Sequence, residues 1–447
     1  MDIMKFMKEK IDGLKAKIVR SGLKKVEIFL QRRNFKRVFF EKNELKTLNQ
    51  DDLVGVGIRV VENNRQGFSF TNDPNEVFEV FDRAKELARL SEEDEYLDLP
   101  EPKECVLVEG IYDDRFEEFD LERTLMLGKK MVEIPRRVDG RVSLDSAELT
   151  ITVMENLVWN TLGLELSERK TTALFFLMGM AVEDDKVSSF DYVADASVES
   201  SDLDERIEKS ARVFANRVIS SLGAKSCPSY KGKVLLSPNA VGTILVQSLN
   251  FLVNSENVQE GRSLWAGKLN EKVASKVLTF LDSPRKPRKF TSVSFDREGV
   301  PTRDLVIIED GVLKSYIYNT YRARRENRKS TGHASGGYQS TPSVSMNAPG
   351  LKGSFSLDEM LKMMDEGIFV RRYSGNVNPV NGIFSGTVKG GKYVKNGNYV
   401  YPLIGTMISG NIFELLNNIT AISEETETTF FGELPYVLVD NVDVVSS

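Results

Sequence analysis

The sequence is poor in the residues that most often hold a metal ion. Its 447 residues include one histidine, His333, and two cysteines, Cys105 and Cys227. A zinc site takes about three or four ligands, and imidazole and thiolate groups dominate among them. One histidine cannot supply such a site alone, and both cysteines precede residue 228. Two isolated cysteines also form no disulfide framework, which favours a cytoplasmic location.

The sequence also lacks an excess of positive charge and a long apolar run. Lysine and arginine number 60 against 66 acidic residues, for a formal net charge of -6. Nucleic-acid-binding chains commonly carry a basic face, so we expect no direct nucleic-acid partner. A membrane-spanning helix needs about 20 predominantly apolar residues, and no segment offers them, so we expect no membrane partner. Hydrophobic residues at 41% and charged residues at 28% are typical of a globular protein.

Apolar periodicity predicts helices and strands in blocks rather than in strict alternation. Helical spacing covers 1–22, 74–90, 121–132 and 201–222. Alternating patterns predict a hairpin from 26–30 and 35–41, a second strand pair from 55–62 and 66–71, and a meander of three strands at 141–155, 157–167 and 171–183. Asn63 and Asn64 suit the turn of the second pair, because asparagine tolerates the left-handed conformation. Blocks of this kind favour the α+β class.

A linker divides the chain into two predicted domains. Residues 223–232, GAKSCPSYKG, have the composition of a boundary segment. We predict an N-terminal α+β domain at 1–222, with an antiparallel sheet and helices. The C-terminal domain at 233–447 is rich in glycine and short strand patterns, so we predict a β-rich fold for it.

The most informative stretch is 233–253, KVLLSPNAVGTILVQSLNFLV. An apolar strand ends at Leu236, Ser237 is a good N-cap, and Pro238 suits the first helical position. The apolar residues that follow recur at helical spacing, and they include Val241, Leu245, Leu249 and Leu252. We therefore predict a strand that runs into a buried helix.

This stretch resembles the strand and helix that carry the HExxxH motif in the TldD/PmbA family of metallopeptidases. Four other segments are similar to the family, more closely to its PmbA (TldE) branch, and follow in the expected order: 55–60 (GVGIRV), 295–300 (FDREGV), 329–334 (KSTGHA) and 408–412 (ISGNI). Aligned on the shared Ala-Val-Gly, the two histidines of the motif fall on Pro238 and Thr243, and the glutamate falls on Asn239. This is the branch that lacks the zinc motif.

The three aligned residues are unsuited to zinc catalysis. Proline has no donor atom, an amide is a poor general base, and a single hydroxyl is a weak zinc ligand. The metal shell of the family also uses a cysteine from the C-terminal half, which this chain lacks. We therefore assign no catalytic residue and no metal ligand to this chain, and describe Pro238, Asn239 and Thr243 as a degenerate metal site.

The resemblance implies an assembly of two chains, in which a TldD-type subunit carries zinc and a PmbA-type subunit does not. The family is implicated in cytoplasmic peptide degradation and processing and, by an older name, in modulation of DNA gyrase. We therefore predict a subunit that is inactive alone, forms a homodimer in isolation, and handles peptides with a zinc-bearing partner. The alternative is a peptide- or protein-binding regulatory homodimer that needs no peptidase partner.

Two further groups of residues are candidates for function. Ser330, Asp296 and His333 suggest a nucleophile, base and orienter, although a glycine-rich GHASGG segment also occurs in purely structural turns. Arg322 and Arg324 could bind a peptide carboxylate through their forked guanidinium groups, or could be solvated surface charges. The candidate peptide-binding set is Arg322, Arg324, Ser330, His333 and Asn411.

Overall fold

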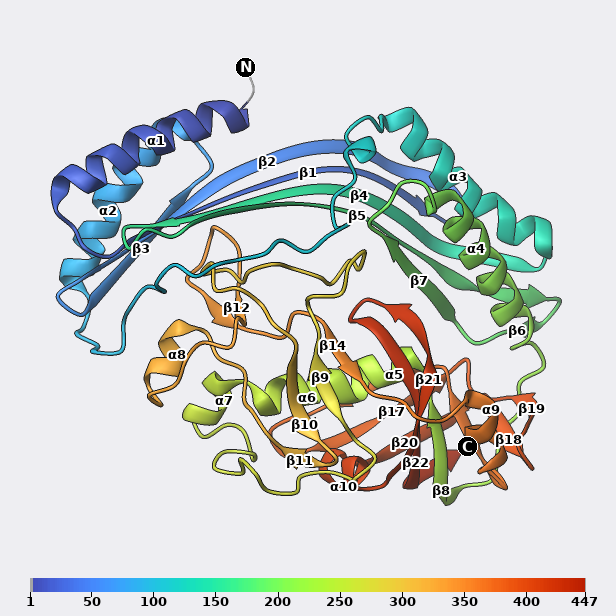
Figure 1. Ribbon diagram of the computed structural model, residues 1–447. Helices are drawn as coiled ribbons and strands as arrows, with labels where there is room; N and C mark the ends of the chain where they lie inside the picture. The colour runs from blue at the N-terminus through green and yellow to red at the C-terminus, as the bar shows by residue number, and fades with distance from the viewer. Residues whose placement is uncertain (1–2, 447) are drawn as a thin grey trace.

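The computed structural model describes residues 3–446, in which a curved antiparallel sheet arches over a β-rich second half (Figure 1). The strand order of the first sheet is β3-β2-β1-β4-β5-β6, and β7 pairs with β5. The elements of this half are α1 (Ile3–Ser21), β1 (Val26–Glu41), β2 (Glu44–Glu62), β3 (Arg65–Thr71), η1 (Pro74–Glu76), α2 (Val77–Leu90), η2 (Asp114–Phe116), α3 (Leu121–Val138), β4 (Val142–Asn160), β5 (Glu165–Glu183), β6 (Lys186–Val187), β7 (Asp191–Ser197) and α4 (Leu203–Ile219). The predicted α+β class with an antiparallel N-terminal sheet is confirmed.

Two separate cores lie on the outer face of this sheet, one at each end. At one end Ile28 and Leu30 of β1 pack with α1 and α2, and at the other end Val38 and Phe40 pack with α3 and α4. Figure 1 shows the two helix pairs on the same side of the sheet, with the second half of the chain on the opposite side. Because side chains alternate along a strand, Arg32 also faces outward, between the two cores.

The predicted hairpin at 26–41 and the predicted third strand at 157–167 are wrong. Residues 26–41 form the single strand β1, whose polar middle lies where no helix covers the outer face and Arg32 pairs with Asp52 at 2.6 Å. Residues 142–183 form two long strands, β4 and β5, and 160–164 is their turn. In that turn the side-chain oxygen of Asn160 accepts from the backbone N–H of Leu162 at 2.9 Å, and Gly163 has φ of 97°. Polar residues in the middle of a long strand thus resemble the pattern of a chain reversal.

The second half is built on a mixed sheet with strand order β16-β17-β20-β22-β8-β15-β18-β19, in which β21 pairs with β22. Its β8 and β15 are parallel. The elements are β8 (Tyr230–Leu236), α5 (Pro238–Val241), η3 (Gly242–Val246), α6 (Gln247–Val253), α7 (Ser255–Gln259), β9 (Phe280–Asp282), β10 (Leu305–Glu309), β11 (Val312–Leu313), α8 (Thr320–Arg324), β12 (Ala334–Ser335), β13 (Ser343–Val344), β14 (Pro349–Leu351), α9 (Leu357–Lys362), β15 (Glu366–Val370), β16 (Arg372–Val377), β17 (Ile383–Lys389), β18 (Lys392–Lys395), β19 (Asn398–Pro402), β20 (Thr406–Asn411), α10 (Ile412–Asn417), β21 (Ile419–Thr429) and β22 (Gly432–Ser446). The predicted β-rich character is confirmed.

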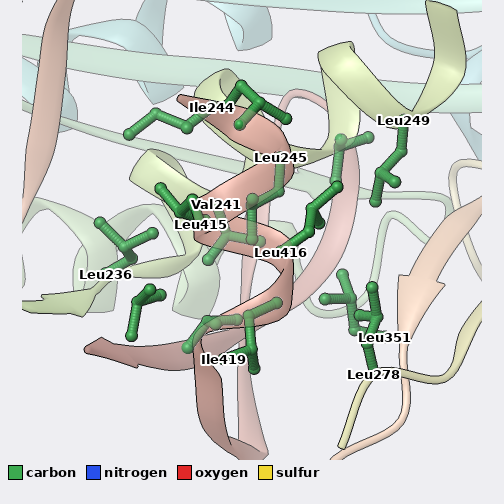
Figure 2. Close-up of a cluster of buried hydrophobic side chains, with 14 of the residues drawn as sticks. Leu236, Val241, Ile244, Leu245, Leu249, Leu278, Leu351, Leu415, Leu416 and Ile419 are labelled. Carbon is green, nitrogen blue, oxygen red and sulfur yellow. The ribbon is translucent and has the colours of Figure 1, made fainter. Parts of the chain in front are cut away.

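The predicted buried helix at 237–253 is present as the continuous run α5, η3 and α6. Val241, Leu245 and Leu249 are completely buried, and Figure 2 shows them facing Leu415, Leu416 and Leu351 across the core. The middle segment η3 is a π-helix, in which the N–H of Gln247 donates to the carbonyl oxygen of Gly242. Even this helix is too short for a bilayer, and among residues 3–446 no helix is long and apolar enough to cross a membrane.

A buried ion-pair network joins the two halves. Arg59 Nη2 of β2 lies 2.6 Å from Glu27 Oε2 of β1 and 3.0 Å from Glu298 Oε1 of the second half. Arg297 Nη1 lies 3.0 Å from Glu27 Oε1, and its guanidinium stacks 3.7 Å from the ring centroid of Phe29. Because each charge has a partner of opposite sign, the network is compatible with burial, and loss of one partner would leave a buried charge uncompensated.

A second contact between the halves uses the two glycines of β2. The loop between β12 and β13 crosses the inner face of the sheet at Gly55 and Gly57. A Cβ atom on Gly55 would lie 2.2 Å from the Tyr338 ring, and one on Gly57 would lie 2.4 Å from the Tyr338 carbonyl oxygen. Only glycine allows the loop to approach the strand this closely.

Candidate functional site

The start of α5 lies where the first sheet meets the second half. Ser237 caps the helix by accepting from the backbone N–H of Ala240, and its hydroxyl donates to the carbonyl oxygen of Arg371. This anchoring fixes the direction in which the side chain of Asn239, two residues further on, projects. Asn239 is 6% exposed, and its Oδ1 accepts a hydrogen bond of 2.9 Å from the hydroxyl of Tyr192 on β7 of the first sheet. The two halves therefore meet through a hydrogen bond at the degenerate site.

Two cavities open at this point and share Asn239. The smaller cavity has a volume of about 200 Å³ and is lined by Tyr192, Asn239, Thr243, Arg372, Tyr373 and Ser374. The larger cleft has a volume of about 550 Å³ and lies between α4, β7 and β21, with Asp195, Arg206, Lys209, Arg217 and Glu427 among its lining residues. Both spaces are lined by Asn239, the residue predicted to align with the glutamate of HExxxH.

The side chains at the degenerate site do not fit a zinc ion. Pro238 is buried and offers no donor atom. The Thr243 hydroxyl donates to the carbonyl oxygen of Asn239 at 3.1 Å, and the Asn239 side-chain oxygen is bonded to Tyr192. Among residues 3–446, no three histidine, cysteine, aspartate or glutamate side chains cluster closely enough to hold a metal. The donor set is thus neutral oxygen and nitrogen, without the thiolate or imidazole groups that zinc prefers.

Arginines dominate the electrostatics around α5. Arg217 Nη2 lies 3.0 Å from Glu427, and Arg371 Nη1 lies 3.3 Å from the same carboxylate. Burial would raise the pKa of Glu427, but these guanidiniums outweigh it and lower the pKa below the usual value. Burial raises the pKa of Asp191, which the same arginines only partly oppose. The adjacent Arg372 stacks 4.9 Å from the ring centroid of Tyr192.

The candidate peptide-binding arginines lie on α8, and both are paired with carboxylates. Arg322 Nη2 is 2.9 Å from Glu260, and Arg324 forms an ion pair with Asp98. Arg322 also lines a cavity of about 350 Å³ together with Arg59 of the first sheet. The predicted peptide-binding arginines therefore lie at a boundary between the halves, Arg322 beside a cavity, and their charges are already partly neutralised.

The structure does not join Ser330, Asp296 and His333 into a catalytic relay. The Ser330 hydroxyl donates to the carbonyl oxygen of Tyr318 at 3.2 Å, and the His333 ring lies 3.2 Å from Asp282 through Nε2. Asp296 accepts from the backbone N–H of Ala334 at 3.0 Å.

Two of these predicted residues have local structural contacts. Nδ1 of the buried His333 lies 2.9 Å from the hydroxyl oxygen of Thr331. Asn411 caps α10 by accepting from the backbone N–H of Phe413 at 2.9 Å. The structure thus distributes the five candidate peptide-binding residues over three separate places: α8, the segment before β12, and the start of α10.

Sequence reasoning missed the residues that surround Asn239. Tyr192, Arg217 and Arg372 come from β7, α4 and β16, and no sequence motif links them. One signal was available for Arg372: two consecutive arginines follow the apolar strand β15, an unusual place for paired charge.

Comparison with known proteins explains the arrangement of the two halves. The family model described as the PmbA/TldA metallopeptidase C-terminal domain matches residues 229–446, and the model of domain 1 of the same metallopeptidases matches residues 26–88. The chain belongs to the PmbA/TldD family. Asn239 lies within the C-terminal match, whereas its hydrogen-bond partner Tyr192 lies between the two matched ranges.

Relatives in the PmbA/TldD family align along most of the chain. An uncharacterized protein of Methanocaldococcus jannaschii is 29% identical over 373 residues, which are 83% of this chain and 84% of that protein. A metalloprotease PmbA homolog of Buchnera aphidicola is 26% identical and covers 94% of this chain and 92% of its own length. A metalloprotease TldD homolog of the same organism is also 26% identical, over 65% of this chain and 63% of that protein.

Solved structures of this family share the fold. A Thermotoga maritima protein, named as a candidate modulator of a DNA gyrase, superposes with a TM-score of 0.90 at 26% identity, over 98% of this chain and 100% of that one. TldE from Thermococcus kodakarensis superposes with a TM-score of 0.88 at 22% identity, over 98% of this chain and 100% of that chain. At 22% identity, the similarity to the Thermococcus kodakarensis protein is evidence for a shared fold only.

Proposed function

We propose that this PmbA/TldD-family chain is the PmbA-like (TldE-like), zinc-free subunit of a two-chain cytoplasmic metallopeptidase. It shapes the chamber in which a peptide is held, while a TldD-type partner carries zinc and cleaves the peptide. The observation that carries the proposal is the side-chain chemistry at α5. A buried proline, a hydrogen-bonded amide and a hydroxyl bonded to the backbone occupy the positions that align with HExxxH.

Two further observations support the proposal. The cleft of about 550 Å³ beside Asn239 has carboxylates and cationic groups on its walls, which suits the mixed charges of a peptide. One organism, Buchnera aphidicola, has both a PmbA homolog and a TldD homolog that are similar to this chain, as expected of two subunits that act together. Two chains of one fold present related surfaces, so the lone chain is expected to form a homodimer.

Zinc content and peptide cleavage test this function. The purified chain is expected to contain less than stoichiometric zinc by mass spectrometry and to leave an unfolded peptide intact. Mixed with the TldD-type chain of the same organism, it is expected to co-elute in gel filtration and to permit cleavage. A matched mixture in which the motif glutamate of the TldD-type chain is replaced by glutamine should co-elute without cleaving, which separates assembly from chemistry.

Two outcomes would contradict the proposal in different ways. Stoichiometric zinc together with peptidase activity in the lone chain would show that this subunit is itself the enzyme. Peptide binding by a lone homodimer that ignores the TldD-type chain would instead favour the regulatory binding protein.

A further inference from the structure

The smaller cavity beside α5 is rich in groups that donate hydrogen bonds. Its volume is about 200 Å³, which suits the end of a peptide or a small organic acid. The hydrogen-bond acceptors that line the cavity carry no charge, and the Asn239 side-chain oxygen already accepts a hydrogen bond from the hydroxyl of Tyr192. The hydroxyl of Tyr373 donates to the carbonyl oxygen of Asn376 at 2.7 Å. Of the residues that the structure describes, none that lines this cavity carries a carboxylate.

The side-chain amide nitrogen of Asn239 is one available donor. Asn239 is 6% exposed, and its hydrogen bond to Tyr192 uses the oxygen of the amide. Within residues 3–446, no protein group accepts from its nitrogen. The nitrogen is therefore free to donate to a ligand in the cavity that offers an acceptor.

Arg372 is the second donor, and it differs from its neighbours in having no carboxylate partner. Its Nε is buried and makes no hydrogen bond, and across the described part of the chain the guanidinium forms no ion pair. Arg217 and Arg371 both pair with Glu427. Within residues 3–446, the guanidinium stacks 4.9 Å from the ring centroid of Tyr192 and acts electrostatically on the carboxyl group of Asp191 without forming an ion pair.

The local charge balance is therefore positive. Three guanidiniums, of Arg217, Arg371 and Arg372, surround two carboxyl groups, of Asp191 and Glu427. Arg372 is half-buried, and its buried Nε has no hydrogen-bond partner, so a ligand that pairs with the guanidinium would be stabilised. The partner missing from the protein is an anion, and a guanidinium fork matches a carboxylate with two parallel hydrogen bonds.

We propose that this cavity binds a carboxylate group, with Arg372 as its ion-pair partner and the Asn239 amide as a second donor. The ligand class is a peptide or amino acid with a free carboxylate, whose remaining atoms extend into the larger cleft that shares Asn239. The site goes beyond the two-chain function and does not depend on it, because both donors belong to this chain. Inorganic phosphate shares the same recognition chemistry and is the alternative source of the anion.

The test measures binding to the full-length chain by isothermal titration calorimetry. The probes are N-acetyl-Ala-Ala with a free carboxylate, the same dipeptide as its C-terminal amide, and inorganic phosphate. We expect the free carboxylate to bind about tenfold or more tightly than the amide, because the amide loses a charge-assisted hydrogen bond.

Variants assign the binding to named side chains. Arg372→Gln is expected to weaken carboxylate binding about tenfold or more, while Arg372→Lys keeps the charge and loses only the fork, so it should retain part of the affinity. Asn239→Asp places a negative charge beside the ligand and should abolish binding. Arg212→Gln, an exposed arginine of α4 paired with Glu208, is the control and should bind as the unaltered chain does. Thermal melts confirm that each variant is folded.

The outcomes separate this inference from the proposed function. Equal affinity for the dipeptide and its amide, or unchanged binding by Arg372→Gln, would overturn it, as would the absence of any binding to the unaltered chain. Binding of phosphate alone that depends on Arg372 would support the anion site and assign it to an inorganic anion. Zinc content and cleavage by the mixed chains are independent readouts, so either idea can fail without the other.

Discussion

Two clusters of charged residues join the halves of this protein, and they differ in how completely their charges are paired. The network of Glu27, Arg59, Arg297 and Glu298 contains two guanidiniums and two carboxylates, each in contact with a group of opposite charge. At the other end of the sheet, the cluster around α5 has one guanidinium more than carboxylates.

The difference shows which of the two contacts is structural. In the first network Glu298 also accepts from the backbone N–H of Thr320 at 2.8 Å, and its side chain is completely buried. Both carboxylates of that network are paired with guanidiniums, so its charges balance, although Arg59 Nε and Arg297 Nη2 make no hydrogen bond. Around α5 a guanidinium and an amide face a cavity, so the same residue types are available for binding. An arginine that is paired with a carboxylate holds the two halves together, whereas one without a carboxylate partner can bind a ligand.

The largest expected effect comes from breaking the paired network. Arg59→Met leaves Glu27 and Glu298 buried with only Arg297 to offset them, and the unfolding free energy is expected to fall by about 3–5 kcal/mol. Urea denaturation monitored by circular dichroism measures it. The control Arg212→Met, at an exposed pair, should change stability by about 0.5 kcal/mol or less. A loss from Arg59→Met as small as that of the control would remove the distinction between the two clusters.

The same network should be sensitive to acid. Burial alone would raise the pKa of Glu27, but Arg59 and Arg297 outweigh it and lower the pKa below 4.5. Because the folded-state pKa is lower than the unfolded one, Glu27 stabilises the protein fully above pH 4.5 and the stabilisation is lost as the pH falls through the folded value. Glu27→Gln should therefore show a weaker decline in thermal stability below pH 4.5 than the unaltered chain. Parallel curves for the two proteins would contradict this.

A smaller effect is expected at the contact between Tyr192 and Asn239. Tyr192→Phe removes the hydrogen bond to Asn239 but keeps the ring beneath Arg372, and it should lower the unfolding free energy by about 1 kcal/mol. In the carboxylate titration it frees the amide oxygen, which repels an anion, so affinity should fall modestly. A stability loss as large as that of Arg59→Met would contradict the comparison, because the contact at Asn239 would then hold the halves together as strongly as the ion-pair network does.

The smallest expected effect, and the sharpest comparison, concerns Arg372. Because it has no carboxylate partner, Arg372→Met should leave the unfolding free energy within about 0.5 kcal/mol of the original value or raise it. The adjacent Arg371→Met removes a partner of Glu427 and should cost about 1–2 kcal/mol. If the two variants were equally destabilised, Arg372 would have a structural role and would not be reserved for a ligand.

The sequence was most informative where local patterns decide the structure. The buried helix after Ser237 and the turn at Asn63 and Asn64 follow from capping and from the left-handed preference of asparagine, and both are present, with φ of 52° and 57° at the two asparagines. The hairpin predicted at 26–41 failed because the polarity of Arg32 depends on where helices leave the sheet uncovered. That position is set by tertiary packing and not by neighbours in sequence.

The candidate site was predictable only in part, for the same reason. The helix that carries Asn239 follows from its apolar spacing. Its hydrogen-bond partner Tyr192 lies 47 residues earlier in the chain, and Arg372, which lines the same cavity, lies in the distant strand β16. Their proximity depends on how the two halves dock. The absence of a carboxylate partner, which distinguishes Arg372 from Arg217 and Arg371 among the described residues, has no signature in the sequence.

The close approach of Tyr338 to Gly55 and Gly57 makes the sequences of these two segments depend on each other. Any homologous exchange that moved one half without the other would set a glycine-bearing strand against a foreign loop, or this loop against a strand with side chains. Hybrids between members of the family are therefore expected to be viable only when both segments are inherited as a pair.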